Sequence, residues 1–169
     1  GVDIDPNSTY AVVIGPPEND TFTNNNVITF NYMAVDNLGS IANCTLYING
    51  AANLTNDTIT NGTASTFGPM QLADDYYTWF VRCYDGSGNQ GDSDTYDLEI
   101  DTEAPQYFDV NEYPTDPATY AAGQDYNFNI TFNDKEEMDT VWIEWEGSNY
   151  SVGYLGQIYY FEQTGLPVS

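Results

Sequence analysis

The sequence lacks histidine altogether and has almost no basic residues. Only Arg82 and Lys135 oppose 26 acidic residues, which gives a formal net charge of -24. Nucleic acids and anionic lipid surfaces bind to basic patches, so this composition argues against both as partners. A surface of crowded carboxylates attracts cations instead, and calcium would relieve its self-repulsion. Adaptation to salt, or simple solubility, explains the same charge equally well.

These absences also limit catalysis, because most acid–base and nucleophilic sites use histidine as the base. A single Lys and a single Arg cannot form a clamp for a phosphoryl group. A pair of carboxylates of the glycosidase kind is the remaining chemistry. The acidic run at residues 134–137 has the composition of a solvated loop between strands rather than of such a pair. The sequence therefore predicts a protein that is not an enzyme.

Long apolar runs are missing too, and none approaches the roughly 18 residues of a membrane-spanning helix. Residues 1–5 show neither a basic start nor the apolar centre of a signal peptide, so we expect any signal or anchor to lie outside this chain. Stretches rich in helix formers are nearly absent as well. Tyr, Thr, Val, Ile and Phe recur in short runs between Asn, Gly, Asp and Pro, which is typical of strands and turns. The chain is predicted to be all-β.

The sequence repeats itself at an offset close to the length of one sandwich domain. In residues 2–10, a strand pattern ends in Ile-Asp and is followed by a short polar link and then Tyr. Residues 98–107 show the same order of features. The segment 44–50 likewise matches 141–147. We therefore predict an immunoglobulin-like β-sandwich as a tandem repeat, with one domain over residues 1–101 and a partial second domain over 102–169.

Within the first repeat, alternation of apolar and polar residues marks the inward faces of the expected strands. The runs with strand character are 10–14, 27–35, 43–49, 58–72 with a break, 76–84 and 94–100. Their number and spacing fit a seven-strand sandwich. The second repeat shows the same alternation at 126–132 and 141–145.

The second repeat is incomplete, because it has no counterpart of region 76–100, which supplies the last two strands of the first. A sandwich without those strands has an unpaired edge and an open core. We therefore expect these residues to be a fragment of a longer repeat chain. Donation of the missing strand by a neighbouring subunit is the alternative.

Only two cysteines are present, Cys44 and Cys83, and both fall on inward faces of strands that are neighbours in an immunoglobulin-like sheet. A disulfide between them is therefore predicted, and it would stabilise the domain by roughly 3 to 4 kcal/mol on the chain-entropy model. Two free core thiols are the alternative. The cysteines show no spacing typical of a metal site.

Glycan acceptor triplets, Asn-x-Ser/Thr without Pro in the middle, are more frequent than composition predicts. Ser and Thr make up about 15% of the chain, so chance predicts roughly three triplets. The acceptors are Asn7, Asn19, Asn43, Asn53, Asn56, Asn61, Asn129 and Asn149. Alternation places Asn43 and Asn129 toward solvent. We expect several acceptors to carry N-linked glycans, although an Asn-rich and Thr-rich composition explains some of the triplets.

The run at residues 76–91, followed by 100–105, resembles the last two strands and the linker of immunoglobulin-like repeats in archaeal and bacterial surface proteins. It is similar in particular to the Asn- and Thr-rich repeats of archaeal surface, sheath and filament proteins. The resemblance covers residues 1–101 well and 102–169 partially. It implies a fold and an extracellular, cell-surface setting rather than a reaction.

Some repeats of this kind bind calcium at the linkers between domains through acidic residues. The resemblance places such ligands at Asp101 and Glu103, with Asp85 and Asn89 in a nearby turn. Hard oxygen donors suit calcium better than a transition metal. A plain Asx-rich turn beside a solvated linker is the alternative.

The predicted function is structural: a glycosylated, self-assembling subunit of an extracellular filament or appendage, a sheath or a surface layer. Its partners would be copies of itself or neighbouring repeats. A carbohydrate-binding or adhesin stalk domain that contacts cell-surface glycans is the alternative, because Trp142 and Tyr47 are expected to face outward. A sugar-binding module would show a row of coplanar aromatic rings, whereas an assembly subunit would bury them against a neighbour.

Overall fold

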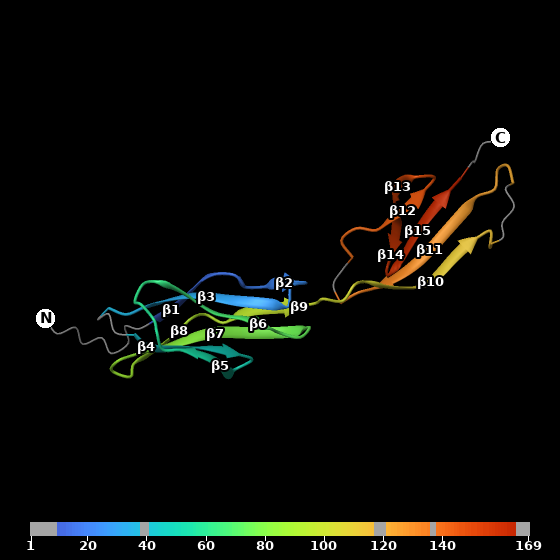
Figure 1. Ribbon diagram of the computed structural model, residues 1–169. Helices are drawn as coiled ribbons and strands as arrows, with labels where there is room; N and C mark the ends of the chain where they lie inside the picture. The colour runs from blue at the N-terminus through green and yellow to red at the C-terminus, as the bar shows by residue number, and fades with distance from the viewer. Residues whose placement is uncertain (1–9, 38–40, 117–120, 136–137, 165–169) are drawn as a thin grey trace. The chain divides into compact units, whose positions relative to one another are not determined.

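The computed structural model describes residues 10–37, 41–116, 121–135 and 138–164 (Figure 1). All of the regular secondary structure in this described part consists of β-strands, which confirms the all-β prediction. The chain divides into two compact units, Gly1–Thr102 (unit 1) and Glu103–Ser169 (unit 2). No helix long and apolar enough to cross a membrane occurs among the described residues.

Unit 1 is an immunoglobulin-like β-sandwich. Its strands are β1 (Tyr10–Gly15), β2 (Thr21–Thr23), β3 (Val27–Val35), β4 (Ile41–Ile48), β5 (Ala51–Asn56), β6 (Ala64–Gln71), β7 (Asp75–Asp85), β8 (Gln90–Asp92) and β9 (Tyr96–Ile100). One sheet has the order β1-β3-β6, and the other has the order β2-β9-β7-β4-β5, with β8 beside β7. The pairing is antiparallel except between β2 and β9, which are parallel.

The core of unit 1 consists of alternate residues of its long strands. Over most of β3, β4 and β7 buried side chains alternate with less buried ones, which confirms the faces that alternation predicted. Aromatic rings fill the space between the sheets, with Phe30 edge-on to Trp79 at 4.9 Å and Tyr32 stacked on Phe67 at 4.6 Å. The two sheets are therefore joined by a continuous apolar layer.

The described residues of unit 2 form six strands. They are β10 (Gln106–Tyr113), β11 (Tyr126–Asn133), β12 (Trp142–Trp145), β13 (Ser148–Ser151), β14 (Gly153–Leu155) and β15 (Ile158–Gln163). One sheet has the order β10-β11-β15-β14, and β12 and β13 form a separate hairpin. That unit 2 is a partial immunoglobulin-like repeat stays a prediction.

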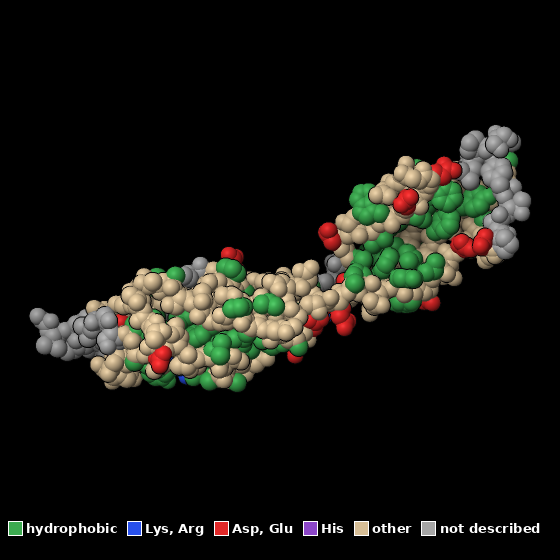
Figure 2. Space-filling view, in the orientation of Figure 1, with side chains coloured by type: hydrophobic (Ala, Val, Ile, Leu, Met, Phe, Trp, Pro, Cys, Tyr) green, Lys and Arg blue, Asp and Glu red, His purple; other side chains and the backbone are tan. Residues whose placement is uncertain are grey.

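Burial differs sharply between the two units. Among the described residues, every buried hydrophobic side chain belongs to unit 1. In the described part of unit 2 the apolar side chains are half-buried or exposed, and Figure 2 shows hydrophobic side chains on the side of the unit turned toward the viewer. The strands of unit 2 therefore leave apolar surface in contact with solvent.

Candidate functional site

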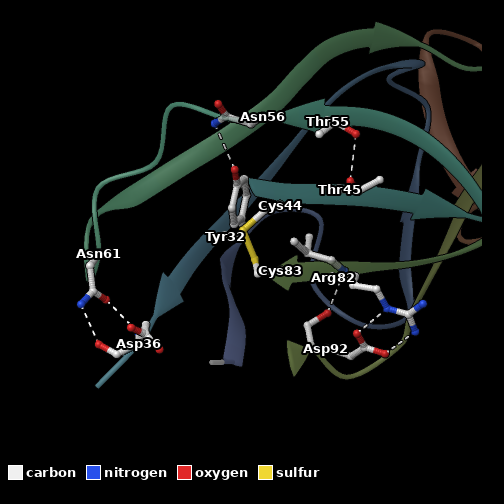
Figure 3. The surroundings of a disulfide bond; sticks show 12 residues. Tyr32, Asp36, Cys44, Thr45, Thr55, Asn56, Asn61, Arg82, Cys83 and Asp92 are labelled. Carbon is white, nitrogen blue, oxygen red and sulfur yellow. Dashed lines mark hydrogen bonds and ion pairs between the residues drawn. A yellow bond between two sulfur atoms is a disulfide. The ribbon is translucent and has the colours of Figure 1, made fainter. Parts of the chain in front are cut away.

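A disulfide joins Cys44 and Cys83 in the middle of unit 1 (Figure 3). The two residues are directly opposite each other on the neighbouring strands β4 and β7, with 4.0 Å between their Cα atoms. Both side chains are fully buried. The bond closes a loop with a sequence separation of 39 residues. It therefore links two core strands that already pair through their backbones.

The outward face of the same strands carries a compact cluster around Arg82. The guanidinium donates two hydrogen bonds to the Asp92 carboxylate, at 2.7 and 2.6 Å, and this pairing raises the pKa of Arg82 above its usual value. It also lies over the rings of Tyr47 and Phe80, 5.2 and 5.5 Å from their centres. Those rings stack on each other at 4.7 Å. The only basic residue of unit 1 is thus paired by charge and by aromatic contact.

The two aromatic residues that the sequence assigns to interaction lie in different surroundings. Tyr47 faces outward on β4 but is half-buried beside Phe80 and beneath Arg82. Trp142 lies on β12 of unit 2 and is 58% exposed. The two belong to different units, so the structure does not bring them together in one aromatic row within a unit.

Asp85 and Asn89, two of the predicted calcium ligands, lie together at the turn between β7 and β8. The Asp85 carboxylate accepts hydrogen bonds from the backbone nitrogens of Ser87 and Asn89 and from Asn89 Nδ2, each at 2.8 Å. Burial alone would raise the pKa of Asp85, but these bonds together lower it below its usual value. The Asp85 carboxylate thus stabilises the turn in which it lies, in agreement with the alternative of a plain Asx-rich turn.

Asp101, the third predicted ligand, is separated from that turn within unit 1. Asp101 follows β9, whose residue Ile100 pairs with Asp75 at the start of β7, whereas Asp85 ends β7. Glu103 begins unit 2. The described part of the chain contains no group of three or more acidic, His or Cys side chains arranged to hold a metal ion. Within unit 1, Asp101 therefore lies at the opposite end of β7 from Asp85 and Asn89, and calcium binding stays a prediction.

The glycan acceptors differ in accessibility. Asn7 lies outside the described residues. Exposed side chains belong to Asn19, Asn53, Asn129 and Asn149, and half-buried ones to Asn43, Asn56 and Asn61. Asn43 is therefore less open to solvent than alternation predicted, whereas Asn129 faces solvent as expected.

The side-chain amides of two half-buried acceptors form hydrogen bonds within unit 1. Asn56 Nδ2 donates to the Tyr32 hydroxyl at 3.1 Å (Figure 3). Asn61 Nδ2 donates to the Asp36 carbonyl at 2.7 Å, and its Oδ1 accepts from the Asp36 backbone nitrogen at 2.9 Å. The triplet motif cannot reveal such bonds, because it records only the identity of neighbouring residues.

Unit 2 contains an apolar groove of about 230 Å³ between β12 and the sheet formed by β10, β11 and β15. We call it the β12 groove. Its apolar lining includes Val110, Phe128, Ile130, Val141, Ile143 and Phe161. The apolar alternation at 126–132 and 141–145 is the sequence signal that points to these facing apolar surfaces.

Comparisons with known proteins bear on the fold. A family model described as a bacterial Ig-like domain matches residues 14–102. Among solved structures, the fibronectin(III)-like modules of Clostridium thermocellum CbhA are similar, with a TM-score of 0.43 and 11% identity over 92% of this chain and 79% of that chain. A structure concerned with host cell surface retention of a 1.5-MDa bacterial ice-binding adhesin has a TM-score of 0.39 and 20% identity, over 94% of this chain and 55% of that one. No curated protein matches the chain.

Proposed function

The chain belongs to the bacterial Ig-like domain family, and from this premise we propose that it is a structural, non-catalytic module of an extracellular cell-surface protein. Domains of this kind are generally non-catalytic. In the finer form of the proposal, the chain is a glycosylated, self-assembling subunit of a filament or appendage, a sheath or a surface layer, similar to the repeats of archaeal surface proteins. Its partners are then copies of itself or neighbouring repeats.

The observation that carries the proposal is the buried disulfide between Cys44 and Cys83. Disulfides of this kind form and persist in oxidising compartments and are rare in the cytosol. Four glycan acceptors that lie exposed on the described surface support the same setting. A net charge of -24 would keep such a surface module soluble outside its designed contacts.

The first test is the location and chemical state of the protein in its native cells. Intact cells would be treated briefly with protease, and the released peptides would be analysed by mass spectrometry after alkylation without reduction. We expect the Cys44–Cys83 linked peptide and glycosylated peptides in the released fraction, with a reduced sample as the control. Recovery of both cysteines as free, alkylated thiols from the cytosol would contradict the proposal.

Self-assembly requires a separate test, because a surface stalk would give the same peptides. Cryo-electron microscopy of native cell surfaces, labelled with an antibody to this chain, would show a helical or lattice repeat for a filament or a layer. Isolated flexible strings without such a repeat would favour the stalk.

The carbohydrate-binding alternative rests on the exposure of Trp142, since an exposed indole can stack on a sugar ring. A glycan array would compare the unmodified protein with Trp142→Ala and with Tyr154→Ala, which removes an aromatic ring of similar exposure, 57%, from β14. Glycan binding lost only in Trp142→Ala would favour this alternative.

A further inference from the structure

The glycan acceptors of unit 1 differ in how the fold holds their side-chain amides. Glycan transfer forms a bond between Asn Nδ2 and the anomeric carbon of a sugar that is activated as a glycosyl phosphate. The bond from that carbon to the phosphate oxygen breaks, the phosphate leaves with the electron pair, and one Nδ2 proton passes to a base of the transferase. The enzyme must therefore reach and orient the amide, and an amide that is already bonded within the fold must first be released.

Asn61 is bonded through both ends of its amide. Its Nδ2 donates to the Asp36 carbonyl at 2.7 Å, and its Oδ1 accepts from the Asp36 backbone nitrogen at 2.9 Å (Figure 3). The next residue, Gly62, donates its backbone N–H to the Ala34 carbonyl at 2.9 Å. The triplet that begins at Asn61 is thus attached to the end of β3, and a transferase would have to open these bonds.

Asn56 is bonded in the same way at both ends. Its Nδ2 donates to the hydroxyl of Tyr32, a fully buried residue, at 3.1 Å. Its Oδ1 accepts from the backbone nitrogen and from Oγ1 of Thr58, each at 3.0 Å. The amide of Asn56 therefore belongs to the edge of the core, and the third residue of its own triplet is part of that arrangement.

Two further acceptors are restrained by pairing between strands. Asn19 is exposed, but its Oδ1 accepts from the backbone nitrogen of Asp97 on β9 at 3.0 Å. Asn43 is half-buried on β4, which lies between β5 and β7, and it pairs with Tyr84 of β7. The middle residue of its triplet is Cys44, which the disulfide holds in the core.

Asn53 lies in a different setting, on the last strand of its sheet. Leu46 of β4 pairs with Leu54 of β5, but the next residue of β4 pairs with Ala52. Asn53 is therefore the extra residue of a β-bulge and has no partner on β4. Its side chain is exposed, and among the described residues none forms a hydrogen bond with it. Its amide can be reached without opening a bond of the fold.

We propose that Asn53 is the acceptor of unit 1 that receives an N-linked glycan in the folded protein, and that the fold protects the other described acceptors of this unit. Those protected acceptors are Asn19, Asn43, Asn56 and Asn61. Use of Asn53 rests on the proposed function, because it requires that the chain is glycosylated. The third residue of the triplet, Thr55, shares one hydrogen bond of 2.8 Å with Thr45, and its exposed hydroxyl has capacity for another.

The first measurement is the occupancy of each acceptor in the native protein, by mass spectrometry of intact glycopeptides. We expect glycan at Asn53 at an occupancy at least about tenfold higher than at Asn56 or Asn61, because each of these must lose more than one hydrogen bond. Glycan on other acceptors of the chain but not on Asn53 would overturn the proposal and leave the proposed function intact. A chain without glycan at any acceptor would overturn both.

A peptide of residues 50–64 separates the effect of the fold from the effect of local sequence, because it contains the triplets of Asn53, Asn56 and Asn61 without their tertiary contacts. Membranes of the native cells would supply the transferase and the activated sugar. The complete chain, produced without glycan and with its disulfide formed, would be compared with the peptide. We expect transfer to Asn53 rather than Asn61 in the chain, and to both in the peptide. The same preference in chain and peptide would overturn the proposal.

Two variants of the complete chain complete the test. Asn53→Gln removes the acceptor, and we expect unit 1 to lose its glycan. Thr45→Val removes the triplet of Asn43 and the hydroxyl partner of Thr55 but keeps the triplet of Asn53, so occupancy at Asn53 should stay unchanged. Thermal melts would confirm that both variants are folded. Transfer to Asn56 or Asn61 in folded Asn53→Gln would show that the fold does not protect them, and would overturn the proposal.

Discussion

Asp85 illustrates how a single carboxylate can close a turn in an acidic protein. Its hydrogen bonds to Ser87 and Asn89 satisfy donors at the end of β7, where the strand stops pairing with β8. In the folded protein these bonds stabilise the ionised form, so the folded-state pKa lies below the usual value. The side chain is therefore a source of stability that depends on pH.

We expect Asp85→Ala to lower the melting temperature of unit 1 at neutral pH. The contribution of Asp85 is fully present above the usual Asp pKa of 3.8 and is lost as the pH falls from there through the lower folded-state pKa. The difference between variant and unmodified protein should therefore shrink in acid, as measured by circular dichroism melts over a pH series. Asp94→Ala, at an exposed residue of the same region, is the control. A difference that persists unchanged at the acid end would contradict this account.

The disulfide permits a second prediction at the level of residues. Replacing both Cys44 and Cys83 by Ala should lower the free energy of unfolding of unit 1 by about 3 to 4 kcal/mol, because the unfolded chain regains the freedom of a long loop. Urea denaturation of the oxidised protein and the double variant would measure the change. The unmodified protein under reducing conditions is the control, since it breaks the bond and keeps every side-chain atom. A loss below about 1 kcal/mol would show that the backbone pairing of β4 and β7 already provides the constraint.

At the scale of elements, β6 depends on one glycine at an irregularity in its pairing with β3. The register shifts between Ile28 and Phe30, and Gly68 lies opposite this shift with a φ of 95°. A Cβ atom at Gly68 would lie 2.7 Å from the Ile28 carbonyl oxygen and 2.9 Å from the Met70 nitrogen. Both contacts are with backbone, which cannot rotate away.

Gly68→Ala is therefore expected to destabilise unit 1 by about 1 to 3 kcal/mol, through backbone strain together with this close contact. Gly15→Ala is the matched control, because no atom lies within 4 Å of a Cβ at that position and its φ is not positive. Thermal melts of both variants would measure the difference. Equal stability of the two variants would mean that β6 relaxes around the added methyl group.

The elements that the sequence predicts best are those whose two faces differ. Strands β3, β4 and β7 have one face in the core, so their apolar residues alternate and can be read directly. Strand β5 was missed because Ala51–Asn56 is an edge strand with almost no buried side chain and hence no alternation. Its signal was the turn before it, since Asn49 and Gly50 both adopt the positive φ that favours Asn-Gly in hairpins.

In the candidate site, the sequence likewise predicted only those features that a local pattern of residues marks. The cysteine pair followed from two inward faces on neighbouring strands, which local alternation determines. The bonds that hold Asn56 and Asn61 join positions 24 and 25 residues apart, and no local pattern encodes such distances. The separation of Asp85 from Asp101 likewise depends on the register of β7 and β9, which composition alone does not reveal.

At the scale of the whole molecule, one chain combines a unit with a closed core and a unit whose apolar side chains remain partly in water. Burial of apolar surface is the main favourable contribution to folding, and each unit must obtain it from its own strands or from a partner. The two units should therefore differ in stability, although they share the pairing of β1-β3-β6 and β10-β11-β15.

Hydrogen exchange of the complete chain would measure this difference directly. Amides of β3, β4 and β7 should exchange only through global unfolding of unit 1, because their side chains form the buried core. Amides of β11, β12 and β15 should exchange faster, through opening of unit 2 alone, because no buried hydrophobic side chain resists that opening in the part of the unit that the structure describes. Reduction of the disulfide should accelerate exchange in unit 1 and leave unit 2 unchanged, which provides an internal control. Equal protection of the two units would mean that unit 2 gains its stability without a closed core.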